Sequence, residues 1–192
     1  MARYMWRVTC LLLLSIVFLS AMLTPAGAQT GRHVNVATLS GAVDPIMAQY
    51  IERVIDTSVD DGAVALVIEM DTPGGLDSSM RRIISRMLAS PIPIIVYVSP
   101  PGARAGSAGV FITMAANIAA MAPSTNIGSA HPVGGQGEDI GGDLGTKIVN
   151  DAAAYIRTIA EKRGRNADWA EQAVRQSLNI GEEEALREKV IE

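Results

Sequence analysis

The chain has 192 residues, 48% of them hydrophobic and 19% charged, which is enough for one domain with a sizeable core and too apolar for an intrinsically disordered protein. Its formal net charge is −4. Domains that bind nucleic acid are usually basic, so no nucleic-acid partner is expected. The single cysteine, Cys10, excludes a disulfide framework, a thiolate nucleophile in the main domain and a cysteine-based metal site.

The first 28 residues have the pattern of a secretory signal. Arg3 and Arg7 precede an apolar run of about 16 residues from Val8 to Leu23, and Ala26-Gly27-Ala28 offers a small-residue cleavage site. The alternative is an uncleaved N-terminal anchor, since the run is only slightly shorter than a membrane span. In both cases we expect residues 29–192 to form one domain exported to the outer face of the cytoplasmic membrane.

The rest of the chain alternates between predicted strands and predicted helices. Strands are expected at His33–Leu39, Ala63–Met70, Ile94–Val98 and Ile118–Ala122. Helices are expected at Asp44–Ser58, Leu76–Ala89, Ser107–Asn117, Lys147–Arg163, Ala167–Ser177 and Glu182–Lys189. Such alternation predicts an α/β domain with a mostly parallel sheet flanked by helices.

Two segments stand out from this pattern. Residues 105–137 contain no Asp, Glu, Lys or Arg, which indicates either buried core or the lining of an apolar cleft. Residues 132–146 hold six glycines and three acidic residues, and they are predicted to form a long loop of the kind that is often functional.

Ser107 is the first candidate for chemistry. It follows a predicted buried strand, lies between Gly106 and Gly109 with only alanine besides, and begins a predicted helix. A sharp strand–turn–helix junction exposes a serine hydroxyl, and the N–H of Ala108 at the helix start would favour an oxyanion. The alternative interpretation is a small N-cap residue packed closely against the sheet.

Gly74 and Gly75 are the second candidate. They follow a buried strand at its carboxyl end, where α/β folds place their sites, and their backbone N–H groups could approach a substrate carbonyl unobstructed. The alternative is a tight strand-to-helix turn after Pro73.

Two residues compete for the role of general base. Lys147 begins the predicted helix after the glycine loop, and it must be neutral to accept a proton; the alternative is a surface lysine paired with Asp151, four residues on. His131, at the end of the uncharged stretch, is the other candidate, with a structural histidine in a turn as the alternative. We expect no metal and no cofactor, because no cluster has metal-ligand spacing and no phosphate-binding loop occurs.

Taken in order, several segments resemble the N-terminal protease domain of NfeD-type proteins, membrane-bound relatives of ClpP and signal peptide peptidase A. The resemblance covers nearly all of His33 to Glu192, and its motifs here are DTPGG, PIPIIVYVSPPGARAGSAG, AMAPSTNIGSAHPVGG and KIVNDAAAYIRTIAEKRGRNADWAEQAVRQS.

The resemblance implies a ClpP/crotonase-like spiral core and a serine endopeptidase. It implies that Ser107 is the nucleophile and Lys147 the base, with the N–H groups of Gly74 or Gly75 and of Ala108 as the oxyanion hole. It further implies a homodimer that cuts apolar segments of stomatin-like membrane partners. His131 matches the place of the ClpP histidine, so it stays an alternative base.

Longer family members continue into membrane-spanning helices and a small β-barrel domain, and this sequence is expected to be a short form or a fragment. Two other functions remain open: a crotonase-like acyl-CoA enzyme, which an export signal disfavours, and a non-catalytic scaffold for a membrane partner.

Overall fold

The computed structural model describes residue 1, residues 31–135 and residues 137–192. The chain divides into two compact units, residues 1–31 and 32–192, and the second contains all the described helices and strands. Apart from residue 1, the predicted signal segment lies outside the described residues. Of the helices that are described, none combines the length and the apolar character needed to cross a membrane.

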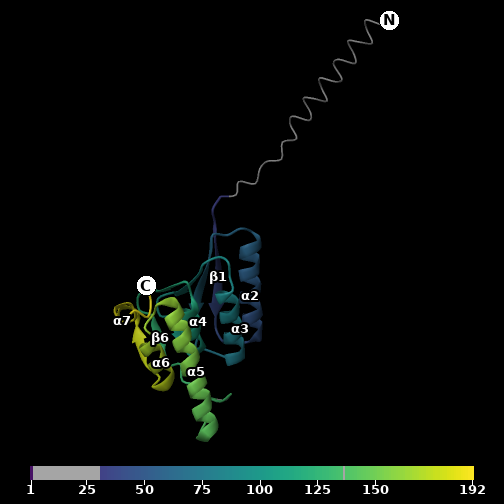
Figure 1. The fold of residues 1–192 in the computed structure, drawn as a ribbon. Helices are drawn as coiled ribbons and strands as arrows, with labels where there is room; N and C mark the ends of the chain where they lie inside the picture. Colours follow the sequence, from purple (N-terminus) through teal and green to yellow (C-terminus); the bar gives the residue numbers. More distant parts are fainter. Residues whose placement is uncertain (2–30, 136) are drawn as a thin grey trace. The chain divides into compact units, whose positions relative to one another are not determined.

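Four parallel strands form the main sheet (Figure 1). They are β1 (Val34–Ser40), β2 (Ala65–Asp71), β3 (Ile94–Val98) and β5 (Ile118–Met121), in the order β1-β2-β3-β5. All three pairings are parallel, with Met70 opposite Val98 in the register of β2 and β3. The carboxyl ends of these strands therefore lie at one edge of the sheet, as the sequence pattern predicted.

Helices pack on one face of this sheet. α2 (Pro45–Asp60) and α4 (Ala108–Ala115) contact the strands, and α3 (Asp77–Leu88) packs against both of these helices. α5 (Gly142–Arg163) packs on α4 and α6 (Ala167–Arg175) packs on α5, whereas α7 (Glu182–Arg187) contacts the smaller sheet described below. Alternate residues of β2, such as Ile68 and Met70, are fully buried against them. The prediction that Ala63–Met70 would be buried on both faces is wrong, because Glu69 is exposed on the opposite face.

A second, smaller sheet was not predicted. It contains β4 (Arg104–Gly106), β6 (Asn126–Gly128) and β7 (Asn179–Gly181), with β4 parallel and β7 antiparallel to β6. Strands of three residues are too short to show a period of two, so their sequences indicate only loops. A single bridge between Thr72 and Ala105 joins this sheet to the end of β2.

Capping residues fix several helix ends. The Asp44 carboxylate accepts a hydrogen bond from the Met47 N–H at 2.7 Å, and Asn166 accepts one from the Trp169 N–H at 2.9 Å. Gly164 ends α5 in the left-handed conformation, with φ of 71°. Ile46, in the first turn of α2, is 76% exposed.

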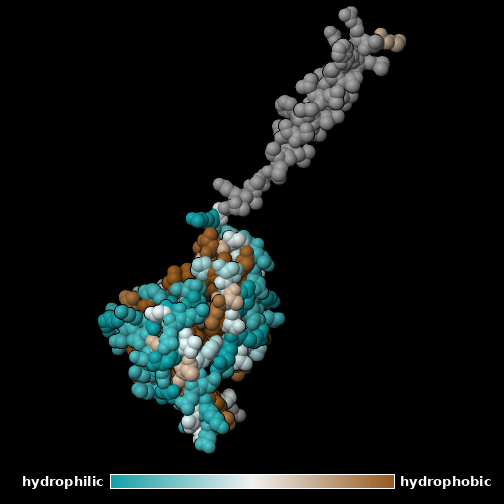
Figure 2. Space-filling view, in the orientation of Figure 1, coloured by the Kyte–Doolittle hydropathy of each residue, from teal (hydrophilic) through white to brown (hydrophobic). Residues whose placement is uncertain are grey.

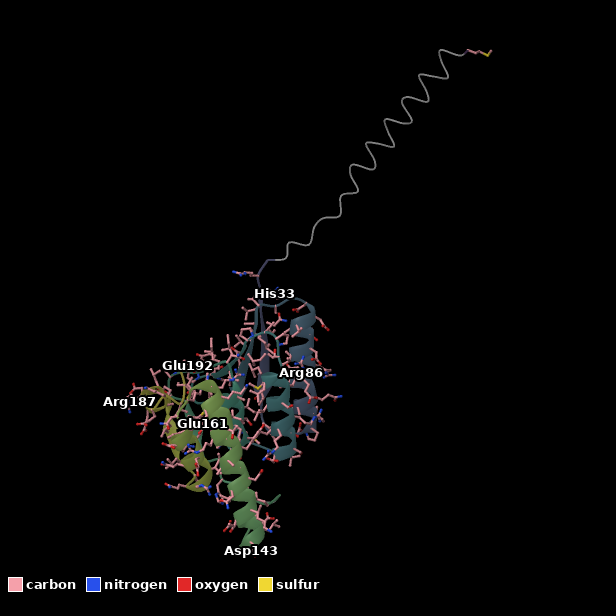
Figure 3. All side chains as sticks on the ribbon, in the orientation of Figure 1. His33, Arg86, Asp143, Glu161, Arg187 and Glu192 are labelled. Carbon is pink, nitrogen blue, oxygen red and sulfur yellow. The ribbon has the colours of Figure 1, made fainter. Side chains whose placement is uncertain are left out.

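The beginning of α5 is the largest correction. The helix starts at Gly142, five residues before the predicted start at Lys147, and its first turns project from the body of the domain (Figure 1). Asp143, labelled in Figure 3, marks this projecting end. Gly142 and Gly145 are poor helix formers, and for that reason the sequence indicated a loop. Asp143 in the first turn nevertheless stabilises the helix, because its negative charge interacts favourably with the helix dipole.

Candidate active site

Ser107 lies at the junction between β4 and α4. Its backbone has φ of 50° and ψ of −113°, a conformation that non-glycine residues rarely adopt. The Ser107 N–H donates to the carbonyl oxygen of Gly128 at 3.1 Å, which ties the junction to the small sheet. All eight residues of α4 are buried, whereas Ser107 itself is half-buried. The junction is therefore the strained strand–turn–helix arrangement that presents a serine hydroxyl.

Gly74 lies against the Ser107 side chain. A Cβ atom on Gly74 would come within 2.5 Å of the Ser107 Cβ and 3.0 Å of its Oγ, and Gly74 has φ of +117°. Gly75 is required for a different reason, because a Cβ there would come within 2.4 Å of the Val43 carbonyl oxygen. The two glycines thus permit close backbone packing, and Gly74 permits the position of Ser107 as well.

Two backbone N–H groups near Ser107 are free within the described part of the chain. The Gly74 N–H donates to the Thr72 hydroxyl at 3.0 Å, whereas Gly75 and Ala108 have no such bond from their N–H groups to the described residues. Ala108 is the first residue of α4, so its N–H has no partner within the helix. Of the glycine pair, Gly75 is therefore the one able to bind an oxygen atom.

Thr72 is the residue of this site that sequence reasoning missed. It is fully buried, and its hydroxyl donates to the Gly41 carbonyl oxygen at 2.7 Å while it accepts from Gly74. The Thr72 backbone exchanges hydrogen bonds with β4, accepting from the Gly106 N–H at 2.9 Å. A threonine followed by Pro-Gly-Gly is a signal for a side-chain-stabilised turn, and that signal could have indicated its role.

A small hollow of about 120 Å³ opens beside Ser107. Its apolar walls come from α3, α4, α5 and the segment after β6, through Met80, Phe111, Ala152 and Ala130. Gly75 and Ala108, which carry the two free N–H groups, line it as well. In the view of Figure 2, apolar atoms form a band where α3, α4 and α5 meet on an otherwise hydrophilic face. Asp77 of α3 lines the hollow as well, so its walls combine these apolar side chains with one carboxylate, which Arg81 binds.

Lys147 lies in the second turn of α5, where it is exposed and lines an adjoining hollow of about 490 Å³. The two hollows share four lining residues, among them Pro132 and Ala152. Within the described chain, Lys147 makes no hydrogen bond or ion pair, neither with Ser107 nor with Asp151. The predicted alternative of a Lys147–Asp151 pair is absent because Asp151 pairs with Arg81.

The His131 ring contacts α6 and is not part of the site around Ser107. Its Nδ1 lies 3.0 Å from the Val174 carbonyl oxygen of α6, and His131 is not among the residues that line the hollow beside Ser107. Its neighbours Ala130 and Pro132 do line that hollow. The geometry thus favours the structural interpretation of this histidine.

A charged and aromatic cluster joins α3 to α5 next to the two hollows. The Arg81 Nε donates to Asp77 at 2.9 Å, its Nη2 pairs with Asp151, and its guanidinium lies 4.2 Å from the centre of the Tyr155 ring. Tyr155 stacks on Phe111 with ring centres 6.1 Å apart. Burial raises the pKa of the Tyr155 hydroxyl, against the opposing effect of the Arg81 charge. Across the described residues, no group of three or more His, Cys, Asp or Glu side chains could hold a metal ion.

Comparison with known proteins identifies similar sequences. The family described as "NfeD1b, N-terminal domain" matches residues 33–192. The chain is 39% identical over 184 residues to the membrane-bound protease PH1510 of Pyrococcus horikoshii, covering 94% of this chain and 41% of that protein. It is 32% identical over 126 residues to the membrane protein NfeD1b of Bacillus subtilis, covering 65% of this chain and 28% of that protein. The chain thus spans less than half the length of these relatives.

Solved structures show the same fold. A lysine-to-alanine mutant of the 1510-N membrane-bound stomatin-specific protease, in complex with a substrate peptide, has a TM-score of 0.79 at 39% identity, covering 84% of this chain and 74% of that one. A serine-to-alanine mutant of 1510-N has a TM-score of 0.78 at 39% identity, with 84% and 78% covered. The 1510-N protease specific for a stomatin homolog from Pyrococcus horikoshii has a TM-score of 0.72 at 37% identity, with 84% and 73% covered. These similarities confirm the predicted ClpP-like α/β fold.

Proposed function

The chain belongs to the NfeD1b N-terminal domain family, and on that premise we propose that residues 29–192 form a serine endopeptidase domain with Ser107 as nucleophile and Lys147 as general base. The observation that carries the proposal is the strained junction at Ser107, which faces a hollow bordered by two unused backbone N–H groups. The relatives support it, because 1510-N is described as a protease and was studied as serine and lysine mutants.

The first chemical step forms an acyl-enzyme. The Ser107 Oγ attacks the carbonyl carbon of the scissile peptide bond, and the neutral Lys147 amine takes the hydroxyl proton. The N–H groups of Gly75 and Ala108 bind the oxyanion that develops, at the helix terminus where partial positive charge favours it. The Lys147 ammonium then gives its proton to the leaving nitrogen as the C–N bond breaks.

The second step hydrolyses the ester. A water molecule attacks the acyl carbon and transfers a proton to Lys147, which is neutral again after the first step. The C–O bond to Ser107 breaks, the serine oxygen regains its proton from Lys147, and the carboxylic acid product leaves. The same two N–H groups stabilise both tetrahedral intermediates.

Bound substrate completes the site in this mechanism. Lys147 is exposed and lines the larger hollow, so a peptide that lies across both hollows would cover it and exclude water. Removal of water favours the neutral amine over the ammonium, as a base requires. Catalytic hydrogen bonds of this kind commonly tighten only when substrate binds.

The proposed substrates are apolar segments of membrane-linked proteins, among them a stomatin-like partner. Most of the side chains that line the hollow beside Ser107 are apolar, and 1510-N is described as specific for a stomatin homolog. By the same family resemblance we propose a homodimer held at the outer face of the membrane. Poor cleavage of peptides with charged residues next to the scissile bond is part of this proposal.

Peptide cleavage tests the proposed nucleophile. An apolar peptide should be cut by the wild-type domain and left intact by Ser107→Ala, with circular dichroism showing that both are folded. The matched control is Ser129→Ala, because Ser129 also has a positive φ, of 55°, but does not line the hollow. Cleavage by folded Ser107→Ala at the wild-type rate would show that Ser107 is not the nucleophile. A folded wild-type domain that cuts no peptide would instead favour a non-catalytic scaffold or another kind of enzyme.

A further inference from the structure

Asp151 lies four residues after Lys147 on α5, a spacing at which oppositely charged side chains meet on the helix surface. Both residues line the larger hollow next to Ser107. The pair is nevertheless absent, because Asp151 is bound by Arg81 of α3. One arginine from a neighbouring helix thus takes the carboxylate that would otherwise face the proposed base.

Arg81 is fixed in place from three sides. Its Nε donates to Asp77 one turn earlier on α3, its Nη2 pairs with Asp151 on α5, and its planar face lies on the Tyr155 ring. Tyr155 in turn stacks on Phe111, which walls the hollow beside Ser107. A guanidinium can make these forked and stacked contacts together, whereas the ammonium of a lysine is a point charge.

We propose that Arg81 is a positioning residue for the reaction, which holds Asp151 away from Lys147 so that the lysine can give up its proton. This inference rests on the proposed serine–lysine function. Arg81 touches neither the scissile bond nor Ser107; it acts through the carboxylate that it occupies.

A second carboxylate near Lys147 also depends on Arg81. Asp77 of α3 binds the same guanidinium as Asp151 and lines the same hollow as Lys147, so the loss of Arg81 frees both carboxylates. From α5, Asp143 is four residues before Lys147, but it is exposed at the projecting end of the helix (Figure 3), where water screens it. Glu138 and Asp139 of the preceding loop are also exposed. Asp151 is exposed as well, with 69% of its side chain accessible, but unlike these three residues it lines the same hollow as Lys147.

Loss of Arg81 should shift the pH dependence of activity in one direction. A freed Asp151 carboxylate favours the ammonium form of Lys147, and the reaction needs the amine. The pH at which activity is half-maximal should therefore rise, by about half to one pH unit for a partly exposed pair. Below both midpoints the rate should fall about three- to tenfold, since it follows the fraction of neutral amine.

The test is the pH dependence of the second-order rate of inactivation by a fluorophosphonate, which needs the base but no peptide substrate. Arg81→Gln should move the midpoint of this profile to higher pH. The double variant Arg81→Gln with Asp151→Asn should move the midpoint back toward the wild-type value, and adding Asp77→Asn should remove what remains, because both freed carboxylates are then gone. The matched control is Arg82→Gln, which removes the neighbouring arginine and its ion pair with Glu52 and should not move the midpoint.

Two results would overturn this inference: an Arg81→Gln profile that coincides with wild type, or a shift that is just as large when Asp151 is also neutralised. Should Arg81→Gln not fold, Arg81→Lys replaces it, with a smaller shift and the same rescue expected. Wild-type protein that is not inactivated through Ser107 would instead refute the serine–lysine function itself. Inactivation through Ser107 without the shift would refute only the role of Arg81.

Discussion

Replacing Gly74 by alanine tests whether the glycine turn sets the position of the nucleophile. The added Cβ would lie 2.5 Å from the Ser107 Cβ, so the serine or the turn must move by about 1 Å to reach ordinary van der Waals contact. A misplacement of this size commonly costs about a hundredfold in rate. The φ of +117° adds about 1 to 3 kcal/mol of backbone strain, which lowers the free energy of unfolding.

The assay compares kcat/KM on an apolar peptide with the midpoint of urea unfolding. Gly102→Ala is the control, because Gly102 has φ of +91° but a Cβ there would meet nothing within 4 Å. Both variants should lose stability through the backbone, and only Gly74→Ala should lose about a hundredfold or more in rate. A folded Gly74→Ala with wild-type kcat/KM would refute the reasoning that this contact positions Ser107.

Three further predictions concern the base, the turn and the hollow. Lys147→Ala and Lys147→Arg should both abolish peptide cleavage, while His131→Ala should keep much of it; a folded, inactive His131→Ala beside an active Lys147→Ala would transfer the role of base. Thr72→Val should lower the free energy of unfolding by about 1 to 3 kcal/mol, measured in urea, because it leaves the buried Gly74 N–H without its partner; an unchanged value would show that the hydroxyl is dispensable. Ala152→Leu should fill the hollow and lower kcat/KM for peptides with leucine before the scissile bond more than for those with alanine; equal losses would place that side chain elsewhere.

The sequence could predict those parts of the site that depend on local pattern. A buried strand at Ile94–Val98 followed by small residues around Ser107 already indicates a tight junction before a helix, and the structure has that junction. The Gly74–Gly75 turn was also evident, although a composition of two glycines does not tell which N–H stays free. That choice depends on the Thr72 hydroxyl, which accepts from Gly74 and leaves Gly75 unpaired.

Features that join distant segments could not be predicted. The small sheet brings β4 and β7 together across more than seventy residues, and its three-residue strands carry no periodic signal. Spacing along α5 favoured a Lys147–Asp151 pair, but tertiary packing brought Arg81 within reach of Asp151. The early start of α5 was missed for the same reason. Gly142 and Gly145 have low helix propensity, but propensity is a weak local preference that the rest of the fold can outweigh.

Mass-spectrometric mapping of a fluorophosphonate adduct tests the central claim most directly, because the reagent reacts with an activated serine and requires no knowledge of the substrate. We expect an adduct on Ser107 of the wild-type domain, and its loss in a folded Lys147→Ala variant. A folded wild-type domain that carries no adduct, or that carries it on another serine, would contradict the assignment of Ser107 as the nucleophile.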